Sequence, residues 1–363
     1  MRIAVISTCV FPMPPVGYSG LEMIAWQQAE GLAERGYDVT LFGAEGSQTD
    51  KANLRTLGPV GSWDEHRAYD ACWKELLAYD VVLDHTWQKW SLILKEEGRL
   101  KAPVLCWLHA PVDTMYRELP NVEKPCFVAI SEDQASHFRA LHSRDVRVCK
   151  HGIDTEYYRH LGCRRSGRFL FLARFSRIKG PVLAIDACRK VGVGLDLVGD
   201  TSITNEPDYL EECKAKVVGF NLNNVHHSGN WKSDVPQFRL VGPVTRGQCV
   251  HWFSQAHALL HPNKLFREPL GLAPLESQAC GTPVVAWRRG AMSETVKHGE
   301  TGFLVDSFDG FVTAVEMLRD KSEHDMTVMC ANCREWVTTF FPLKSMTDRC
   351  CELIDEAMST GGW

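Results

Sequence analysis

Short apolar runs alternate along the chain with longer segments whose apolar residues recur every three or four positions. The first run, Ile3 to Ser7, is followed by a loop rich in proline and glycine. Residues 21–35 then carry apolar residues at helical spacing and stop before Gly36, and Asp38 to Gly43 is a second apolar run. Buried strands that alternate with amphipathic helices predict a parallel α/β sheet.

The same alternation continues through the first part of the chain, pauses at residues 155–167 and then restarts. Further strands are expected at 81–84, 104–109, 127–130 and 146–149, and after the pause at 169–173, 194–199, 238–241, 258–260, 283–287 and 301–305. Helices are expected at 181–191, 209–217 and 245–255, from 308 onward, and over 323–359 with a break at Phe341-Pro342. Single hydrophobic cores rarely grow beyond about 250–300 residues. A chain of 363 residues in two such halves therefore predicts two doubly wound domains, residues 1–158 and 159–342.

Residues 266–287 combine two carboxylates, Glu268 and Glu276, with a glycine turn, and expected strands lie on both sides of them. In parallel α/β sheets, ligands bind at the carboxyl ends of strands beside helix N-termini. Loop and helix amides there suit a phosphate, and a carboxylate suits sugar hydroxyls. These residues alone allow two interpretations: a pocket for a ligand with phosphate and hydroxyl groups, or one solvated glutamate and one glutamate in the first turns of a helix.

Two cations and a histidine also lie at the ends of expected strands. Arg174 and Lys179 follow the strand at 169–173, where a guanidinium and an ammonium would suit a diphosphate, although two solvated loop cations are the alternative. His109 ends the strand at 104–109. It could bond a substrate hydroxyl or donate to a departing oxygen, or it could be a structural histidine.

Composition and charge exclude several classes of protein. The net charge is −5 and no basic face is evident, so we expect no nucleic acid partner and no stable membrane association. No apolar run reaches the about 18 residues of a membrane span, and the N-terminus does not resemble a signal peptide, which favours a cytoplasmic protein. The 14 cysteines favour free buried thiols. Zinc is disfavoured at Cys330, Cys333, Cys350 and Cys351, because the second pair is adjacent.

Several motifs of metal and cofactor chemistry are absent from the sequence. There is no Asp-x-Asp that could hold Mg²⁺ against a diphosphate, and no Gly-x-Gly-x-x-Gly, Walker, Gly-x-Ser-x-Gly or His-Glu-x-x-His motif. We therefore expect neither metal nor cofactor. Cationic side chains and the N-terminus of the helix after Gly271 would have to neutralise a departing diphosphate.

Several segments resemble one enzyme family, in the order in which the family has them. They are VGYSGLE with AEGLAERGYDVTLFGA, FLARFSRIKGP, and EPLGLAPLESQACGTPVVAWRRGAMSETVKHGETGFLV, together with WLHAP, VAISEDQ and KHGID. They are similar to the N-terminal signature, the arginine–lysine turn and the Glu-x7-Glu donor motif of family 4 glycosyltransferases. The resemblance implies the GT-B fold, with two Rossmann-like domains facing across a cleft. It also implies that the last helix, within residues 343–363, crosses back onto the first domain.

The resemblance also implies an activity and roles for individual residues. The family transfers a sugar, here a hexose, from a nucleotide diphosphate sugar to a hydroxyl acceptor, with retention and usually without metal. A UDP-sugar is favoured, with GDP- and ADP-sugars as alternatives. By matching motif, Arg174 and Lys179 would bind the diphosphate, Glu276 the ribose, and Glu268 the hydroxyls of the donor sugar as a catalytic group.

Further family positions would complete the site. His109 would lie near the donor sugar as the second catalytic group, from the side of the first domain. The amides around Leu270, Gly271 and Leu272 would cradle sugar or phosphate, and Gly20 would let the backbone approach the donor or acceptor closely. The chain departs from the family at Ser19, where a glycine is usual, at Ala173, also usually glycine, and at Leu270, often aromatic.

We favour a front-face substitution as the mechanism, in which the leaving phosphate would take the proton of the acceptor hydroxyl. An epimerase or a glycan phosphorylase on the same fold, or a catalytically silent binding subunit, are the alternatives. The base, the sugar, the acceptor and the oligomeric state stay open from the sequence. We expect the irregular segment 201–235 to flank the base.

Overall fold

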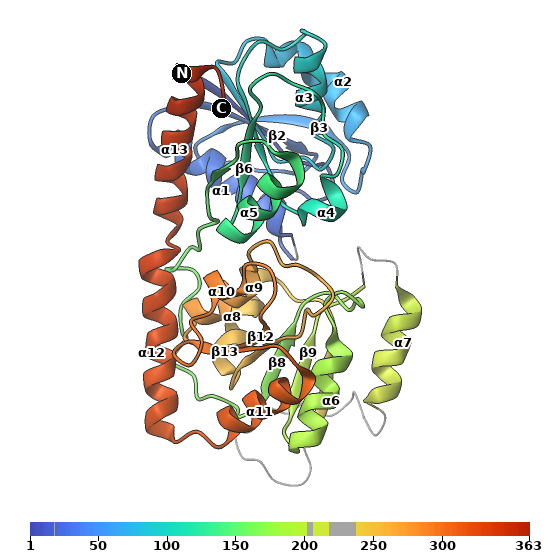
Figure 1. Cartoon of the computed structure of the whole chain (residues 1–363), viewed down its shortest axis with the longest axis vertical. Helices are drawn as coiled ribbons and strands as arrows, with labels where there is room; N and C mark the ends of the chain where they lie inside the picture. Colours follow the sequence, from blue (N-terminus) through green and yellow to red (C-terminus); the bar gives the residue numbers. More distant parts are fainter. Residues whose placement is uncertain (18, 202–205, 218–236) are drawn as a thin grey trace. The chain divides into compact units, whose positions relative to one another are not determined.

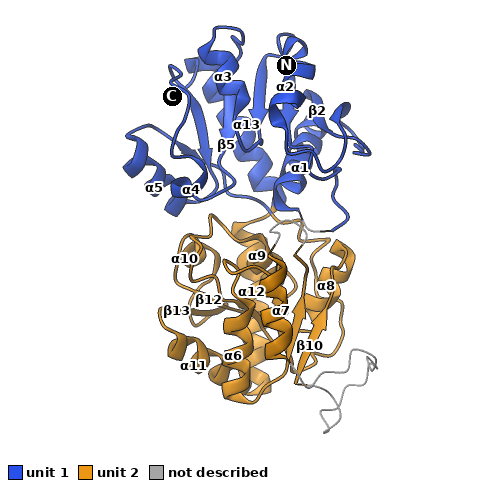
Figure 2. Cartoon of the chain, turned by 90° about the vertical axis from the view of Figure 1, so that its right-hand side faces the viewer, with its two compact units in different colours: residues 1–152, 343–363 blue, residues 153–342 orange. Residues whose placement is uncertain are grey.

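The computed structural model describes residues 1–17, 19–201, 206–217 and 237–363. The chain divides into two compact units, shown in Figure 2. Unit 1 contains residues 1–152 and 343–363, and unit 2 contains residues 153–342. Most of the segment 201–235 that we expected beside a nucleotide base lies outside the described residues.

Unit 1 is built on a seven-stranded parallel sheet in the order β3-β2-β1-β4-β5-β6-β7. Its central strands have no polar face, because helices cover both sides of the sheet. The strands are β1 (Arg2–Ile6), β2 (Asp38–Ala44), β3 (Asn53–Gly58), β4 (Val81–Asp84), β5 (Val104–Trp107), β6 (Cys126–Ala129) and β7 (Arg147–Val148). The helices between them are α1 (Gly20–Glu34), α2 (Glu65–Leu76), α3 (Trp90–Glu96), α4 (Val112–Met115) and α5 (Glu132–His142).

Unit 2 repeats the design with a six-stranded parallel sheet in the order β10-β9-β8-β11-β12-β13. The strands are β8 (Phe169–Leu172), β9 (Leu195–Val198), β10 (Phe238–Val241), β11 (Leu259–His261), β12 (Val284–Trp287) and β13 (Gly302–Val305). The helices are α6 (Pro181–Val191), α7 (Pro207–Lys216), α8 (Arg246–Gln255), α9 (Leu272–Ala279), α10 (Met292–Thr295), α11 (Phe308–Arg319) and α12 (Glu323–Phe340), as labelled in Figure 1. Apolar residues of α6 and α11 form a core with those of β8 and β9.

The strand order of each sheet reverses at one point. In unit 1, β1 pairs with β2 on one side and with β4 on the other. In unit 2, β8 pairs with β9 on one side and with β11 on the other. Loops diverge at such a switch point, which leaves room for a ligand at the carboxyl ends of the strands. The fold therefore directs attention to the loops after β1 and β4 and to those after β8 and β11.

The last helix, α13 (Leu343–Thr360), belongs to unit 1 and packs against α1. A Cβ atom at Gly31 would lie 2.7 Å from Oγ1 of Thr347, so the glycine is what lets these two helices approach closely. Arg147 and Glu356 form an ion pair of 2.7 Å between β7 and α13. The prediction that the C-terminal helix returns to the first domain is confirmed.

Most predicted elements are present to within one or two residues at each end. Three of them, β4, α6 and β10, agree in both bounds, and α11 begins at the predicted residue. The edge strand β3 was not predicted, because its residues are exposed or half-buried and lack an apolar run. The chain divides after Gly152, whereas the predicted boundary was after residue 158. Residues 153–158 pack with unit 2, where the amide of Ile153 donates to the carbonyl oxygen of Phe341 at 2.8 Å.

All 14 cysteines are free thiols, and ten of them are buried. Among the described residues, no group of three or more histidine, cysteine, aspartate or glutamate side chains could hold a metal ion. In the same part of the chain, no helix has both the length and the apolar character needed to cross a bilayer.

Candidate functional site

At the switch point of unit 2, an ion pair joins the loop after β8 to the loop after β11. Lys179 Nζ lies 2.7 Å from Oε2 of Glu268, and both side chains are only about one-tenth exposed (11% and 12%). The two loops can approach because Gly180, with φ +68°, has no side chain; a Cβ atom there would lie 2.7 Å from the carbonyl oxygen of Pro262. Two residues predicted for opposite ends of a donor molecule are thus direct neighbours.

Two further side chains hold the carboxylate of Glu268. Asn263 Nδ2 donates to Oε2 at 2.6 Å, and His261 Nε2 lies 3.4 Å from the same oxygen. Burial alone would raise the pKa of Glu268, but the charges of Lys179 and His261 and the hydrogen bonds from both side chains together outweigh this effect and hold the pKa well below its usual value. Glu268 is therefore an anion over the physiological range. One oxygen is held in place, while Oε1 accepts no hydrogen bond from the described residues.

The glycine turn after Glu268 leads directly into the first turn of α9. Gly271 has φ +93°, and a Cβ atom there would lie 2.6 Å from Cε of Met292 and 3.5 Å from Cγ of Glu268. Leu270 is buried, and its carbonyl oxygen accepts from Oγ1 of Thr295 at 2.7 Å. These contacts fix the turn. The amides of the first residues of α9, such as Leu272, have no partner within the helix, as at any helix N-terminus.

Glu276 has a different environment from Glu268, although both lie in the same motif. It faces Tyr158 and Arg246, and Arg246 Nε lies 3.3 Å from the hydroxyl of Tyr158. Burial raises the pKa of Glu276, and the charge of Arg246 opposes this effect. Arg174, the other expected diphosphate ligand, is half-buried and directly follows the residue after β8.

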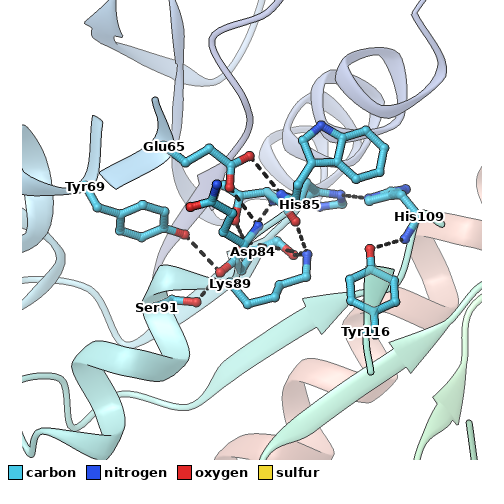
Figure 3. A network of polar contacts seen from close by, with 11 residues as sticks. Glu65, Tyr69, Asp84, His85, Lys89, Ser91, His109 and Tyr116 are labelled. Carbon is cyan, nitrogen blue, oxygen red and sulfur yellow. Dashed lines mark hydrogen bonds and ion pairs between the residues drawn. The ribbon is translucent and has the colours of Figure 1, made fainter. Parts of the chain in front are cut away.

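In unit 1, the polar residues after β4 form a buried network, shown in Figure 3. Asp84 accepts hydrogen bonds from the hydroxyl of Tyr69 at 2.9 Å and from the amide and hydroxyl of Thr86 at 2.8 and 2.6 Å. Ser91 also donates to it. Lys89 Nζ lies 3.8 Å from Oδ1 of Asp84 and donates to two carbonyl oxygens of the same loop.

His109 lies at the edge of this network, just beyond the end of β5. Its Nε2 lies 2.9 Å from Nδ1 of His85, and its amide donates to the hydroxyl of Tyr116 at 3.1 Å. Burial lowers the pKa of His109 well below its usual value, and the neighbouring His85, His151 and Lys89 lower it further. His109 is therefore a neutral imidazole.

Gly20 is the first residue of α1, at the switch point of unit 1. The chain around it is tied together by Glu22, which accepts hydrogen bonds from the hydroxyls of Ser19 and Thr8. The serine that replaces the family's usual glycine thus has a structural partner. The role of Gly20 itself stays a prediction.

Sequence reasoning missed several residues of both sites. In unit 2 these are Asn263, Gly180 and Gly290. At Gly290, a Cβ atom would lie 2.4 Å from the carbonyl oxygen of Glu268. In unit 1 they are Asp84, His85 and Lys89, which are completely buried. A signal was present for the second group, because the polar triplet at 84–86 interrupts an apolar run at the end of a strand.

Two family models match the chain. The model of glycosyl transferases group 1 matches residues 165–328, and that of glycosyltransferase family 4 matches residues 18–157. A D-inositol 3-phosphate glycosyltransferase of Pseudarthrobacter chlorophenolicus is 30% identical over 241 residues, which are 61% of this chain and 52% of that protein. The protein of the same name from Thermobifida fusca is 26% identical, with 85% and 82% covered. The chain spans about half the length of the first curated relatives that it matches.

Solved structures with the same fold include two GT-B glycosyltransferases. Sucrose-phosphate synthase from Thermosynechococcus elongatus superposes with a TM-score of 0.77 at 20% identity, over 99% of both chains. HepE from Anabaena, in complex with UDP-glucose, superposes with a TM-score of 0.76 at 16% identity, over 98% of this chain and 100% of that one. These identities show the fold alone. With both units matched by their family models, the chain belongs to glycosyltransferase family 4 and has the GT-B fold.

Proposed function

We propose that this protein transfers a hexose from a nucleotide diphosphate sugar to a hydroxyl acceptor, with retention at the anomeric carbon and without a metal ion. The observation that carries the proposal is the buried pair of Glu268 and Lys179 beside the N-terminus of α9. It brings a fixed carboxylate and a fixed ammonium from two different loops together beside the first amides of a helix, at the switch point where α/β sheets bind ligands.

The carboxylate is suited to bind sugar hydroxyls. Lys179 and Asn263 both donate to Oε2 of Glu268, so the orientation of the carboxylate is set before a ligand arrives. Oε1 is left to accept hydrogen bonds, and bonds to an ionised acceptor are stronger than neutral ones. A negative charge held beside the sugar also stabilises the positive charge that develops when the diphosphate departs.

The diphosphate would lie at the other end of the same arrangement. Lys179 and Arg174 supply positive charge, and the first amides of α9 add the positive end of the helix dipole. Glu276, with Tyr158 and Arg246 beside it, is the group proposed for the ribose. These cations are proposed to supply the positive charge that a metal ion would otherwise provide.

A front-face substitution fits the groups available. The bond from the anomeric carbon to the diphosphate oxygen breaks, the acceptor oxygen forms a bond on the same face, and its proton passes to the departing phosphate. No protein nucleophile is required. His109, a neutral imidazole in unit 1, is proposed to contact the donor sugar and not to exchange a proton with it.

The relatives support a UDP-sugar donor and a small acceptor. HepE was crystallised with UDP-glucose, and the curated relatives carry D-inositol 3-phosphate in their names. A UDP-sugar is therefore the first donor to test, and a polyol or a phosphorylated polyol is the first acceptor.

Binding and turnover test this function separately. A ligand that binds only the folded protein raises its melting temperature by mass action, so UDP, GDP, ADP and TDP with their glucose and galactose esters form the binding panel. The stabilising donor is then incubated with acceptors in the presence of EDTA, and the anomer of the product is read by NMR. Failure of every nucleotide to stabilise the protein would refute the function. Conversion of the donor without an acceptor would indicate an epimerase instead.

A further inference from the structure

The network at the carboxyl end of β4 buries two charged side chains and a histidine in one loop. Asp84, His85 and Lys89 are all completely buried, and Lys89 has the left-handed backbone conformation, with φ 56°. Burying an ammonium and a carboxylate costs free energy unless both are well paired. We therefore ask which side chain this buried cluster holds in place.

The side chain held in place is the ring of His85. The backbone amide of His85 donates to the carbonyl oxygen of Ile6 at 2.9 Å, which ties this residue to β1. The residues that follow it are tied to α2, because Glu65 accepts from the amides of Trp87 and Gln88 at 2.8 and 2.7 Å. The ring itself stacks on Trp107, with centroids 4.9 Å apart and planes 19° from parallel.

Among the described residues, the ring of His85 makes one polar contact, to His109. Nδ1 of His85 lies 2.9 Å from Nε2 of His109, a hydrogen bond in which either nitrogen could be the donor. The other nitrogen of His85, Nε2, is buried and has no partner among the described residues. Nδ1 of His109 has no hydrogen bond within the described residues either, but His109 is only half-buried and that nitrogen is not enclosed.

Both rings are neutral. Burial, followed by the charge of Lys89, lowers the pKa of His85 well below its usual value. The pKa of His109 is also lowered well below its usual value, and burial lowers the pKa of the third ring, His151, to about 3. The charge of Lys89 opposes protonation of either ring. A pair of neutral imidazoles has two tautomeric arrangements, since each ring carries one N–H.

The environment of His85 Nε2 distinguishes the two arrangements. If His109 donated, His85 would carry its hydrogen on Nε2, where it would be a buried N–H without an acceptor. Such groups are rarer in proteins than buried acceptors without a donor. If His85 donates from Nδ1, its Nε2 holds only a lone pair, and the hydrogen of His109 must lie on Nδ1.

We propose that His85 is a positioning residue that holds His109 in the tautomer with hydrogen on Nδ1. His109 then presents a hydrogen-bond donor to an oxygen of the ligand, where the opposite tautomer would present a lone pair. The inference rests on the proposed function insofar as His109 contacts the donor sugar. The role of His85 itself is defined by the tautomer and can be measured without any substrate.

Nitrogen NMR of the protein labelled with ¹⁵N-histidine measures the tautomer directly, because protonated and bare ring nitrogens have different chemical shifts. The signals of His109 are assigned by their loss in His109→Asn, with the exposed His66→Phe as a control for the removal of a histidine elsewhere. We expect hydrogen on Nδ1 of His109 in the wild-type protein. In His85→Phe, which keeps a ring to stack on Trp107, we expect a mixture of tautomers.

Kinetics with the donor then link the tautomer to the reaction. We expect kcat to fall about tenfold to a hundredfold in His85→Phe, as for other residues that orient a functional group, with a smaller change in KM for the donor. His85→Asn places an amide donor near the position of Nδ1 and should recover much of the loss. A purely structural role would predict instead that both substitutions lower the melting temperature without changing the His109 tautomer.

The outcomes separate the inference from the proposed function. Hydrogen on Nε2 of His109 in the wild-type protein overturns the inference, as does an unchanged tautomer or an unchanged kcat in folded His85→Phe. If His85→Phe does not fold, His85→Leu, which likewise removes the donor at the position of Nδ1, provides the same comparison. If the wild-type protein transfers no sugar, the proposed function fails, and the tautomer measurement still decides the role of His85.

Discussion

Replacing Glu268 by glutamine tests the unit 2 site most directly, because glutamine keeps the shape of the side chain and removes only its charge. An amide oxygen at the position of Oε2 can still accept from Lys179 and Asn263, which now lie 2.7 and 2.6 Å away. The buried ammonium of Lys179 would lose its anionic partner. The substitution therefore acts on the two ends of the proposed donor in opposite directions.

At the sugar end, the change removes a charged hydrogen bond and the negative charge beside the departing group. Hydrogen bonds to charged groups contribute about 1.5–3 kcal/mol, which corresponds to a fall in kcat of about 10- to 150-fold. At the phosphate end, the diphosphate no longer competes with Glu268 for Lys179. At 2.7 Å that attraction is about 6 kcal/mol before desolvation, with an effective dielectric constant of about 20. UDP should bind as tightly as before, or up to about tenfold more tightly.

The assay measures UDP release with donor and acceptor for kcat, and calorimetric titration of UDP alone for its Kd. Glu300→Gln is the control, because the side chain of Glu300 is about half exposed and pairs with a neighbouring lysine on the same loop. An unchanged kcat would remove Glu268 from the mechanism. A Kd for UDP that rose tenfold or more would refute the competition between the carboxylate and the diphosphate for Lys179.

Three other predictions follow from the same loops. Lys179→Ala should weaken the binding of UDP, measured by calorimetry, and equal affinity would exclude Lys179 from the diphosphate site. Because the folded-state pKa of Glu268 lies below its ordinary value of 4.5, its contribution to stability is present above about pH 4.5 and is lost as the pH falls below it. Glu268→Gln should accordingly lose less unfolding free energy than the wild type in urea titrations between pH 5 and pH 3, and parallel losses would contradict this. Gly180→Ala should cost about 2–5 kcal/mol, because its Cβ atom would meet the carbonyl oxygen of Pro262, whereas Gly192→Ala at the other end of α6 should cost only about 1–2 kcal/mol. Equal melting temperatures for the two variants would show that the close approach of the loops is not needed.

Local patterns predicted the elements well, for a physical reason. A buried parallel strand must be apolar along its whole length, and a helix that covers a sheet must repeat its apolar residues every three or four positions. Runs such as Val81–Asp84 and Pro181–Val191 carry these signals unambiguously, and the structure has them with the same bounds. The edge strand β3 carries no such signal, because one side of an edge is open to solvent and its burial is incomplete.

The candidate sites were predicted as sets of residues but not as arrangements. Glu268, Lys179 and His109 were recognised from their motifs and their places at strand ends. That Lys179 pairs with Glu268, 89 positions along the chain, depends on β8 and β11 being neighbours in the sheet. Asn263 and Gly290 owe their importance to the same adjacency and have no distinctive pattern of their own.

The amino-acid sequence by itself determined the two α/β units, the order of their elements and the family, since these depend on local periodicity and on motifs that are continuous in the chain. Only the tertiary structure decided which side chains meet. The contact of His85 with His109 joins the ends of two adjacent strands, and the one unpartnered nitrogen of His85 is defined by everything packed around it. Hydrogen bonds and ion pairs depend on distances of a few ångströms between residues far apart in sequence, and those distances exist only once the sheets have formed.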